Sequence, residues 1–360
     1  MAIELKRYEH NPIVTPADVP PSSPDLEVIG AFNAGAALVG DEIVLLLRVA
    51  ERPISADSRR VGIPRVDLSE TGGHIEVEWV DRDVPELDLS DPRGILYKGR
   101  QYLSSVSHLR VARSRDGFHF AIDPKPTVVP STPYEVYGVE DPRITPIDGA
   151  YYVSYTAVSP MGVCVPLLRT TDFVHFERLG VIFPPENKNV VLFPDRSSGR
   201  YAAFHRPAGS AFGSTPDIWL AYSPDLLHWG DHRRLMGTRA GMWDAGRIGG
   251  GAVPIETPKG WLAIYHAAVG SRYCLGTVLL DREAPHRVLG RSVDPIMTPI
   301  EPYERAGFFG SVVFTCGAVR RSDDEVLVYY GAGDSTLGVA MTSVSELLET
   351  VEPVSALTAA

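Results

Sequence analysis

The chain has 360 residues, of which 44% are hydrophobic, and a formal net charge of -11. The apolar content is ample for a buried core, and the acidic balance argues against a nucleic-acid partner, because phosphate backbones require a basic footprint. No segment approaches the roughly 20 uncharged apolar residues that a membrane span requires, so we expect no membrane partner.

The start of the chain and its cysteines indicate a cytoplasmic protein. The first ten residues contain no apolar run of the kind found in secretory signals. Cys164, Cys274 and Cys316 are odd in number and widely spaced, which argues against a disulfide framework and against a spaced zinc site. No other constellation has metal-ligand spacing, so we predict that neither a metal nor a cofactor is required.

Hydrophobic periodicity is close to two along most of the chain, which is typical of β-strands separated by polar turns. One hairpin pattern recurs five times, with a small-residue strand, a polar turn and an aromatic-rich strand. We expect these hairpins at residues 32–48, 143–156, 190–206, 249–266 and 312–334. The sequence lacks long amphipathic helices, and we expect one short helix near residues 343–351.

A second unit follows four of the hairpins and is similar from copy to copy. It reads ARSRDGFHF at 112–120, RTTDFVHF at 169–176, AYSPDLLHW at 221–229 and, more loosely, AMTSVSELL at 340–348. Asp116, Asp172 and Asp225 align in these copies, and we interpret them as turn caps. Repeats of this size in an all-β pattern predict a five-bladed β-propeller with a central active-site channel.

We interpret residues 1–360 as a single propeller domain. Its first blade is enlarged, over about residues 30–130, because the step from Asn33 to Asp141 is twice the other steps. A β-sandwich is the alternative fold, but it does not explain the self-similar outer units. In a propeller the first strand of each blade lines the channel, so residues at these strand ends converge although they lie far apart in sequence.

The stretch YGVEDPRITP at residues 137–146 combines two acids with a stiff backbone. Pro142 fixes its own φ and restricts Asp141 before it, so the carboxylate is held in place. A turn in which Asp141 caps an amide and Arg143 makes a structural ion pair is the alternative. The convergent positions favour a functional site, with a basic cluster opposite an acid; they are Asn33, Arg48, Glu140, Asp141, Arg143, Lys188, Asn189, Arg206, Asp244, Arg247, His266, Tyr273 and Asp334.

Several short motifs occur in a specific order along the chain. They are FNAGA at 32–36, LLRV at 46–49, VEDPRI at 139–144, NKNVVLFP at 187–194, HRP at 205–207, RIGGG at 247–251, GWLAIYH at 260–266, LLD at 279–281 and YYGAGD at 329–334. Each motif is weak alone, but the ordered set resembles glycoside hydrolase family 130 over nearly the whole chain. This family comprises five-bladed propeller enzymes that act on β-mannosides.

The resemblance implies a reaction and a role for each site residue. Most members are phosphorylases, which release α-mannose 1-phosphate with inversion, and Asp141 matches their general acid. That acid is thought to act through the mannose 3-hydroxyl. The position of Lys188 is more often arginine in the family, and the position of Arg247 is more often lysine, so both substitutions keep the positive charge. The resemblance assigns phosphate to Lys188, Asn189, Arg206, Arg247, His266 and Tyr273, and the mannosyl unit to Asn33, Arg48 and Asp334, with Glu140 and Arg143 also in the substrate site.

The residues themselves favour the same chemistry. An inverting glycosidase needs a second carboxylate to activate water, whereas phosphate arrives as an anion and only has to be bound and aimed by a basic cluster. We therefore predict inverting phosphorolysis of a β-mannoside by a glycosyltransferase-type phosphorylase, with inorganic phosphate as co-substrate. The alternatives are an inverting β-mannosidase that uses water and a propeller that binds glycans or proteins without catalysis.

Some individual assignments have structural alternatives. His266 could be a core histidine, Tyr273 could pack beside Trp261, and Arg143 could be a buried partner of Glu140. We expect Trp243, Phe308 and Phe309 to form either a wall for the leaving-group sugar or part of the core. The sequence leaves open the linkage, the acceptor sugar, the physiological direction and a homo-oligomer formed through the enlarged first blade.

Overall fold

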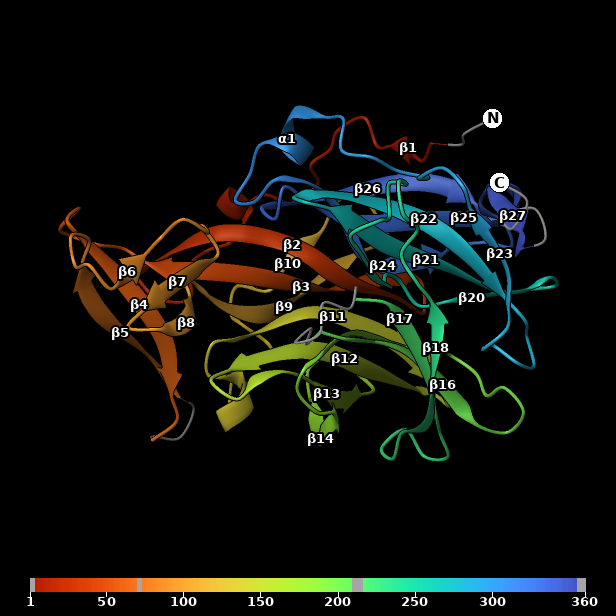
Figure 1. The fold of residues 1–360 in the computed structure, drawn as a ribbon, viewed down its shortest axis with the longest axis horizontal. Helices are drawn as coiled ribbons and strands as arrows, with labels where there is room; N and C mark the ends of the chain where they lie inside the picture. Colours follow the sequence, from red (N-terminus) through yellow and green to blue (C-terminus); the bar gives the residue numbers. More distant parts are fainter. Residues whose placement is uncertain (1–3, 70–72, 209–215, 355–360) are drawn as a thin grey trace.

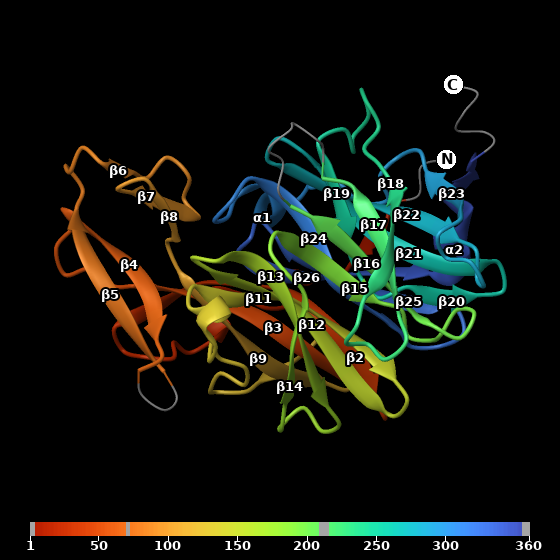
Figure 2. The ribbon, with the colours of Figure 1, turned by 60° about the horizontal axis from the view of Figure 1, so that its bottom comes forward.

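The computed structural model describes residues 4–69, 73–208 and 216–354. Within these ranges the long strands form five antiparallel blades that follow one another along the chain. This architecture is the five-bladed β-propeller that the repeated hairpins predict (Figure 1, Figure 2).

Each blade has its strands in order from the channel outward. Blade one has β2 (Leu26–Val39), β3 (Glu42–Pro53), β9 (Val106–Ser114) and β10 (Ala121–Ile122); blade two has β11 (Gly138–Ile147), β12 (Ala150–Ser159), β13 (Gly162–Thr170) and β14 (Glu177–Phe183). Blade three has β15 (Asn187–Leu192), β16 (Tyr201–Pro207), β17 (Ile218–Ser223) and β18 (Gly230–Met236). Blade four has β19 (Arg247–Gly250), β21 (Gly260–Val269), β22 (Arg272–Leu280) and β23 (Val288–Ser292), with β20 (Ile255–Thr257) and β27 (Val351–Pro353) at its edges; blade five has β24 (Ser311–Arg320), β25 (Glu325–Ala332), β26 (Thr336–Ser343) and β1 (Lys6–Arg7).

Strands of the blades are apolar on both faces because each blade packs against two neighbours. In β3, Leu45 and Leu47 contribute to the apolar cluster shared with blade five, whereas Val44 and Leu46 contribute to the cluster shared with blade two. Similar clusters join blades two and three, three and four, and four and five. Fully burying one such side chain contributes about 1.5–3 kcal/mol. Because an apolar cluster joins each pair of neighbouring blades, these contributions stabilise the closed ring of five blades.

The start of the chain completes the last blade. Strand β1 pairs antiparallel with β26, where Lys6 lies opposite Met341 and Arg7 opposite Ala340. Arg7 also donates to the Oε1 atom of buried Glu304 at 2.7 Å, next to the short helix α1 (Pro302–Arg305). Because the next strand along the chain belongs to blade one, this pairing ties the first and last blades together.

The self-similar outer units are capped turns. The carboxylate of Asp116 accepts hydrogen bonds from the backbone amides of Phe118 and His119, both at 2.9 Å. Asp172 and Asp225 make the same bonds in their own turns. These contacts match the predicted capping role.

The short helical elements also have sequence signals at their ends. Helix α2 (Val344–Glu349) begins with a capping box, in which Ser343 accepts from the amide of Glu346 and the Glu346 carboxylate accepts from the amide of Ser343. The 3-10 turns η1 (Pro16–Asp18) and η2 (Pro133–Glu135) each begin with proline, whose fixed φ suits a helical start.

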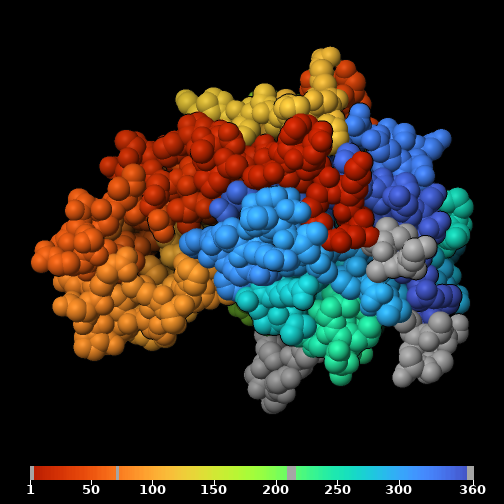
Figure 3. All heavy atoms as spheres, turned by 90° about the horizontal axis from the view of Figure 1, so that it is seen from above, coloured from red at the N-terminus to blue at the C-terminus, as the bar shows by residue number. Residues whose placement is uncertain are grey.

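An arm, residues 60–103, projects from the propeller between β3 and β9 of blade one. It contains the hairpin β4 (Arg60–Asp67) and β5 (His74–Asp81), and a small sheet of β6 (Leu87–Asp88), β7 (Gly94–Tyr97) and β8 (Arg100–Leu103). Ile63, Val80 and Ile95 form its own small core. The arm is drawn in orange on the left of Figure 1, and in Figure 3 its atoms meet the light blue segment near residue 300.

Candidate active site

Most of the predicted site residues lie around one cavity in the centre of the propeller, with a volume of about 410 Å³. They come from all five blades, as expected for strand ends that converge on a common channel. The residues that line the cavity are Asn33, Arg48, Glu140, Asp141, Lys188, Asn189, Arg206, Arg247, His266, Tyr273 and Asp334.

Bulges in the innermost strands aim three of these side chains. The pairing register shifts around Asn33 in β2, around Asp141 in β11 and around Asn189 in β15. Their φ angles are 47°, 49° and 52°, in the left-handed region that asparagine and aspartate tolerate better than other residues with a Cβ. Bulges of this kind redirect side chains beside active sites. The positive φ angles thus favour asparagine or aspartate at these three positions, in addition to any role of their side chains in the reaction.

The acid Asp141 is held by two donors from blade one. Its Oδ1 atom accepts from Asn33 Nδ2 at 2.9 Å and from Arg48 Nη1 at 3.0 Å. Arg48 also donates from Nη2 to Glu140 Oε1 at 2.8 Å, so one guanidinium fixes both acids. Burial opposes ionisation of Asp141, but Arg48, Arg143 and these hydrogen bonds hold its pKa below the ordinary value.

Asp334 is another carboxylate on the cavity wall, and its environment shifts its pKa in the direction opposite to that of Asp141. Burial raises its pKa to about 6, and neighbouring Asp141 and Glu140 act in the same direction against the attraction of Arg48. Two carboxylates in one cavity therefore ionise at different pH values.

The cavity lining also includes three cations that form no ion pair with a carboxylate in the described residues. Lys188 and Arg206 lie directly across from each other on β15 and β16, and Arg247 begins β19. In the part of the chain that the structure describes, none of the three forms an ion pair with an acidic side chain. Burial lowers the pKa of Arg206 to about 10, and Arg247 and Arg143 add to the effect. Burial likewise lowers the pKa of Lys188.

His266 lines the same cavity as a neutral imidazole, although the sequence pattern grouped it with the cations. Its side chain is buried, and burial together with Arg206, Arg143 and Arg247 lowers its pKa well below the ordinary value. Asn189 Nδ2 lies 3.1 Å from His266 Nε2, while Asn189 Oδ1 accepts from Arg143 Nη2 at 3.4 Å. Arg143 can only donate, so Asn189 Oδ1 is the acceptor and Asn189 Nδ2 is a donor toward His266. His266 Nε2 therefore accepts this hydrogen bond, and the imidazole proton is on Nδ1.

The cavity prediction fails for Arg143, which lies beneath the site. Its exposed fraction is 1%, and it donates to the backbone carbonyls of Asp141, Gly250 and Gly251 at 2.9–3.0 Å. Arg143 therefore ties β11 to blade four and supports Asp141 and Asn189, and it is not among the residues that line the cavity. The structural alternative for this residue is the one that the geometry supports, with backbone carbonyls as partners in place of Glu140.

Two other residues of blade four also lie away from the cavity. Asp244 is fully buried in an ion-pair cluster with Arg239 and Arg291, at 2.6 and 2.5 Å. Trp243 stacks on Tyr265 with ring centroids 5.6 Å apart, so it is a packing residue. Among the aromatic residues proposed as a sugar wall, Phe308 does line the cavity.

Comparisons with known proteins show the family to which this chain belongs. A family model described as beta-1,4-mannooligosaccharide phosphorylase matches residues 92–353. The chain belongs to glycoside hydrolase family 130. A curated family relative, the beta-1,2-mannobiose phosphorylase of Listeria innocua, is 45% identical over 97% of this chain and 99% of its own length. A solved structure of a beta-1,2-mannobiose phosphorylase from Listeria innocua with beta-1,2-mannobiose superposes with a TM-score of 0.93, at 45% identity and with coverage of 97% and 99% of the two chains.

More distant relatives support the family assignment. The 1,2-beta-oligomannan phosphorylase of a Thermoanaerobacter species is 38% identical over 69% of this chain and 82% of its own length. The beta-1,4-mannooligosaccharide phosphorylase of Ruminococcus albus is 31% identical over 68% of this chain and 76% of its own length.

The sequence-based assignment missed the contribution of the arm to this family 130 site. Asp91, Arg93, Gly94 and Gln101 line the same cavity as Asp141, together with Leu103 and Ser105 at the return to β9. One signal was present in the sequence, because the tripeptide Asp-Pro-Arg of residues 141–143 occurs a second time at residues 91–93. The arm does not belong to any of the five repeated hairpins, so the repeats do not predict which of its side chains face the cavity.

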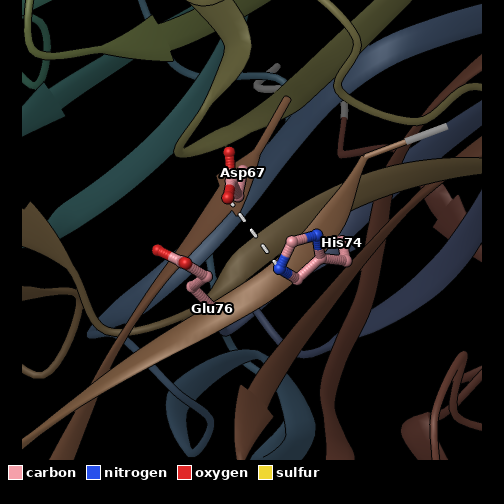
Figure 4. Close-up of side chains that lie close together, drawn as sticks. All are labelled: Asp67, His74 and Glu76. Carbon is pink, nitrogen blue, oxygen red and sulfur yellow. Dashed lines mark ion pairs between the residues drawn. The ribbon is translucent and has the colours of Figure 1, made fainter. Parts of the chain in front are cut away.

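The arm also carries the one cluster of potential metal ligands found in the described residues. Asp67, His74 and Glu76 lie close together on the β4–β5 hairpin (Figure 4). None of them lines the cavity around Asp141. Arg65 donates to Glu76 at 2.8 Å, and Asp67 accepts from the amide and hydroxyl of Ser69. The carboxylates are thus already engaged by protein donors.

A larger cavity, of about 640 Å³, lies between this hairpin and blade one. Its walls are mainly apolar, with Leu26, Val66, Val77 and Val106 among them, and it shares no residue with the site around Asp141.

The helices within the described residues of this chain are too short to span a membrane.

Proposed function

We propose that this chain is a β-mannoside phosphorylase, which cleaves a β-mannoside with inorganic phosphate to give α-mannose 1-phosphate and the shortened acceptor sugar. The observation that carries the proposal is the group of Lys188, Arg206 and Arg247, which lines the same cavity as Asp141 and forms no ion pair with an acidic side chain among the described residues. Arg206 is buried and Lys188 and Arg247 are half-buried. Cations withdrawn from water without an acidic partner are costly, so a bound anion is the natural partner for them. Family relatives named as β-mannoside phosphorylases support this conclusion.

In the proposed step a phosphate oxygen forms a bond to the anomeric carbon, and the glycosidic carbon–oxygen bond breaks. The electron pair of that bond goes to the leaving oxygen, which receives the proton of Asp141 directly or through a sugar hydroxyl. The cations hold the nucleophile by charge-assisted hydrogen bonds, and Asn189, neutral His266 and Tyr273 complete the phosphate site. No second carboxylate is needed to activate water.

The lowered pKa of Asp141 belongs to the site without phosphate. A phosphate anion beside Lys188 and Arg206 adds negative charge near the acid and offsets the positive field. Bound phosphate therefore raises the pKa of Asp141 and favours the protonated form that the step requires. Substrate binding and protonation of the acid are coupled in this scheme.

We infer a β-1,2-linked mannoside as the first substrate to test, because the relative that covers 97% of this chain is named for beta-1,2-mannobiose. We also propose a cytoplasmic location, which is supported by three unpaired, buried cysteines in the described structure. A homo-oligomer remains a prediction from the sequence.

The test is to incubate the protein with a panel of β-1,2- and β-1,4-mannosides, with and without inorganic phosphate, and to assay mannose 1-phosphate. We expect mannose 1-phosphate only when phosphate is present, and none from the Asp141→Asn variant. Release of free mannose at equal rates with and without phosphate would identify a β-mannosidase and overturn the proposal. Sugar binding without turnover under any condition would identify a non-catalytic propeller.

A further inference from the structure

One wall of the active cavity comes from the arm and has no role in the proposed phosphorolysis step. Asp91, Arg93 and Gln101 face the cavity from the loop before β7 and from β8, next to Phe308 of the segment before blade five. Figure 3 shows the arm in contact with this segment, and the guanidinium of Arg93 lies 3.6 Å from the ring centroid of Phe309. The arm is thus docked on the propeller at the mouth of the site.

Asp91 and Arg93 form a planar, two-fold hydrogen-bonded pair. Arg93 donates from Nε to Asp91 Oδ1 at 3.0 Å and from Nη2 to Asp91 Oδ2 at 2.8 Å, which leaves Nη1 outside this pair. Gln101 donates from Nε2 to the carbonyl of Tyr102 at 3.1 Å, and its amide oxygen is outside that bond. The group offers donors and acceptors to a ligand while its own geometry is fixed.

A purely structural role explains this arrangement poorly. The Asp91 and Arg93 side chains are 48% and 40% exposed, and such ion pairs contribute only about 0–1 kcal/mol to stability. Asp91, Gly94 and Phe308 also line a second cavity, of about 360 Å³. This wall therefore borders two cavities.

The remaining walls are already assigned. Asn33, Arg48 and Asp334 surround the acid, where the mannosyl unit belongs, and the cations take the phosphate. The leaving-group sugar must then occupy the part of the cavity that the arm lines. A neutral hexose suits this wall, because vicinal hydroxyls match paired polar atoms in one plane and the apolar face of a sugar ring matches an aromatic side chain.

We propose that Asp91, Arg93 and Gln101, with Phe308, bind the leaving-group hexose and set the acceptor preference of this enzyme. This inference rests on the proposed function, since it assumes that a sugar leaves from this cavity. It assigns the arm to substrate recognition, with Arg93 and Gln101 as the specificity-determining side chains.

The variants Arg93→Ala and Gln101→Ala test the inference, with Arg100→Ala as the matched control. Arg100 is an exposed neighbour of Gln101 on β8 and does not line the cavity. Rates are measured in the synthetic direction, from mannose 1-phosphate and each of mannose, glucose and N-acetylglucosamine. We expect the KM for the acceptor to rise about tenfold or more in Arg93→Ala and about threefold to tenfold in Gln101→Ala.

The same variants are expected to leave the KM for mannose 1-phosphate within about twofold of wild type, and to change the order of acceptor preference. Arg93→Lys, which keeps the charge but loses the fork, is expected to recover only part of the acceptor affinity. An acceptor KM and preference equal to wild type in both alanine variants would overturn the inference, as would an equal rise in both KM values.

Acceptor binding is also measured by saturation-transfer NMR with free mannose, which needs no turnover. Absence of mannose 1-phosphate turnover in the wild type would reject the proposed function alone. In that case, loss of mannose binding in Arg93→Ala but not in Arg100→Ala would still support the arm as the sugar wall. Equal binding by all variants would reject it.

Discussion

Replacing Arg206 by methionine should make the phosphate-free protein more stable and at the same time impair phosphate binding. Arg206 is 8% exposed, its Nε atom has no hydrogen-bond partner among the described residues, and burial lowers its pKa from 12.5 to about 10. At pH 7.5 the side chain is charged in both the folded and the unfolded chain, so the lowered pKa is a cost of folding. This cost is present in full below pH 10 and disappears as the pH rises toward 12.5.

The size of the effect follows from the shift. About 2.5 pH units correspond to about 3 kcal/mol at 1.36 kcal/mol per unit. Replacement of buried charges by apolar side chains of similar size stabilises some proteins by about 1–4 kcal/mol. For a chain of 360 residues, about 3 kcal/mol raises the Tm by about 4 °C. Methionine fills much of the volume of the arginine stem, so little packing is lost.

The assay is thermal unfolding of wild type and Arg206→Met in phosphate-free buffer and with added phosphate. Phosphate at a hundred times its Kd should stabilise the wild type by about 2.7 kcal/mol, and the variant much less. In steady-state kinetics the KM for phosphate should rise by about 10- to 100-fold, with the KM for the mannoside within about twofold.

Arg169→Met is the matched control, because the Arg169 side chain on β13 is 43% exposed; it should change stability by less than about 0.5 kcal/mol and leave the phosphate effect intact. The reasoning is refuted if Arg206→Met melts below wild type in phosphate-free buffer and phosphate still stabilises it fully.

Two further substitutions test two of the carboxylates that line the cavity, Asp141 and Asp334. Asp141→Asn should lower kcat by about 10²- to 10⁴-fold with little change in the KM for the mannoside, measured by steady-state kinetics, because it removes a proton donor and keeps an acceptor for Asn33 and Arg48; activity within tenfold of wild type would contradict its role as the acid. Asp334→Asn should raise stability at pH 7.5 by about 3 kcal/mol but not at pH 4, because a pKa raised from 3.8 to about 6 gives stability at low pH that is lost as the pH rises through 6. Thermal unfolding at the two pH values measures this difference. Equal melting temperatures of variant and wild type at pH 7.5 would contradict the claim that burial destabilises the ionised form of Asp334.

The propeller could be predicted from the sequence because its blades repeat one physical pattern. The hairpins recur, and strands such as β3 are apolar on both faces because Val44 and Leu45 point to different neighbouring blades. The position of the acid was also predictable, since Pro142 and the residues around it restrict the backbone at a strand start.

The remaining features depend on contacts that no local pattern encodes. Arg143 follows the acid in the motif, but the bulge at Asp141 turns it beneath the site, onto carbonyls of blade four. The neutral state of His266 results from its burial beside cations of other blades. The arm residues Arg93 and Gln101 reach the cavity only because an insertion of blade one folds over its mouth.

The central claim is that a phosphate oxygen, and not water, attacks the anomeric carbon. The most direct measurement is the reaction of a β-mannoside with unlabelled phosphate in water labelled with heavy oxygen, followed by mass spectrometry of the products. The account predicts α-mannose 1-phosphate without heavy oxygen on the anomeric carbon. Free mannose that carries one heavy oxygen at that carbon would contradict it.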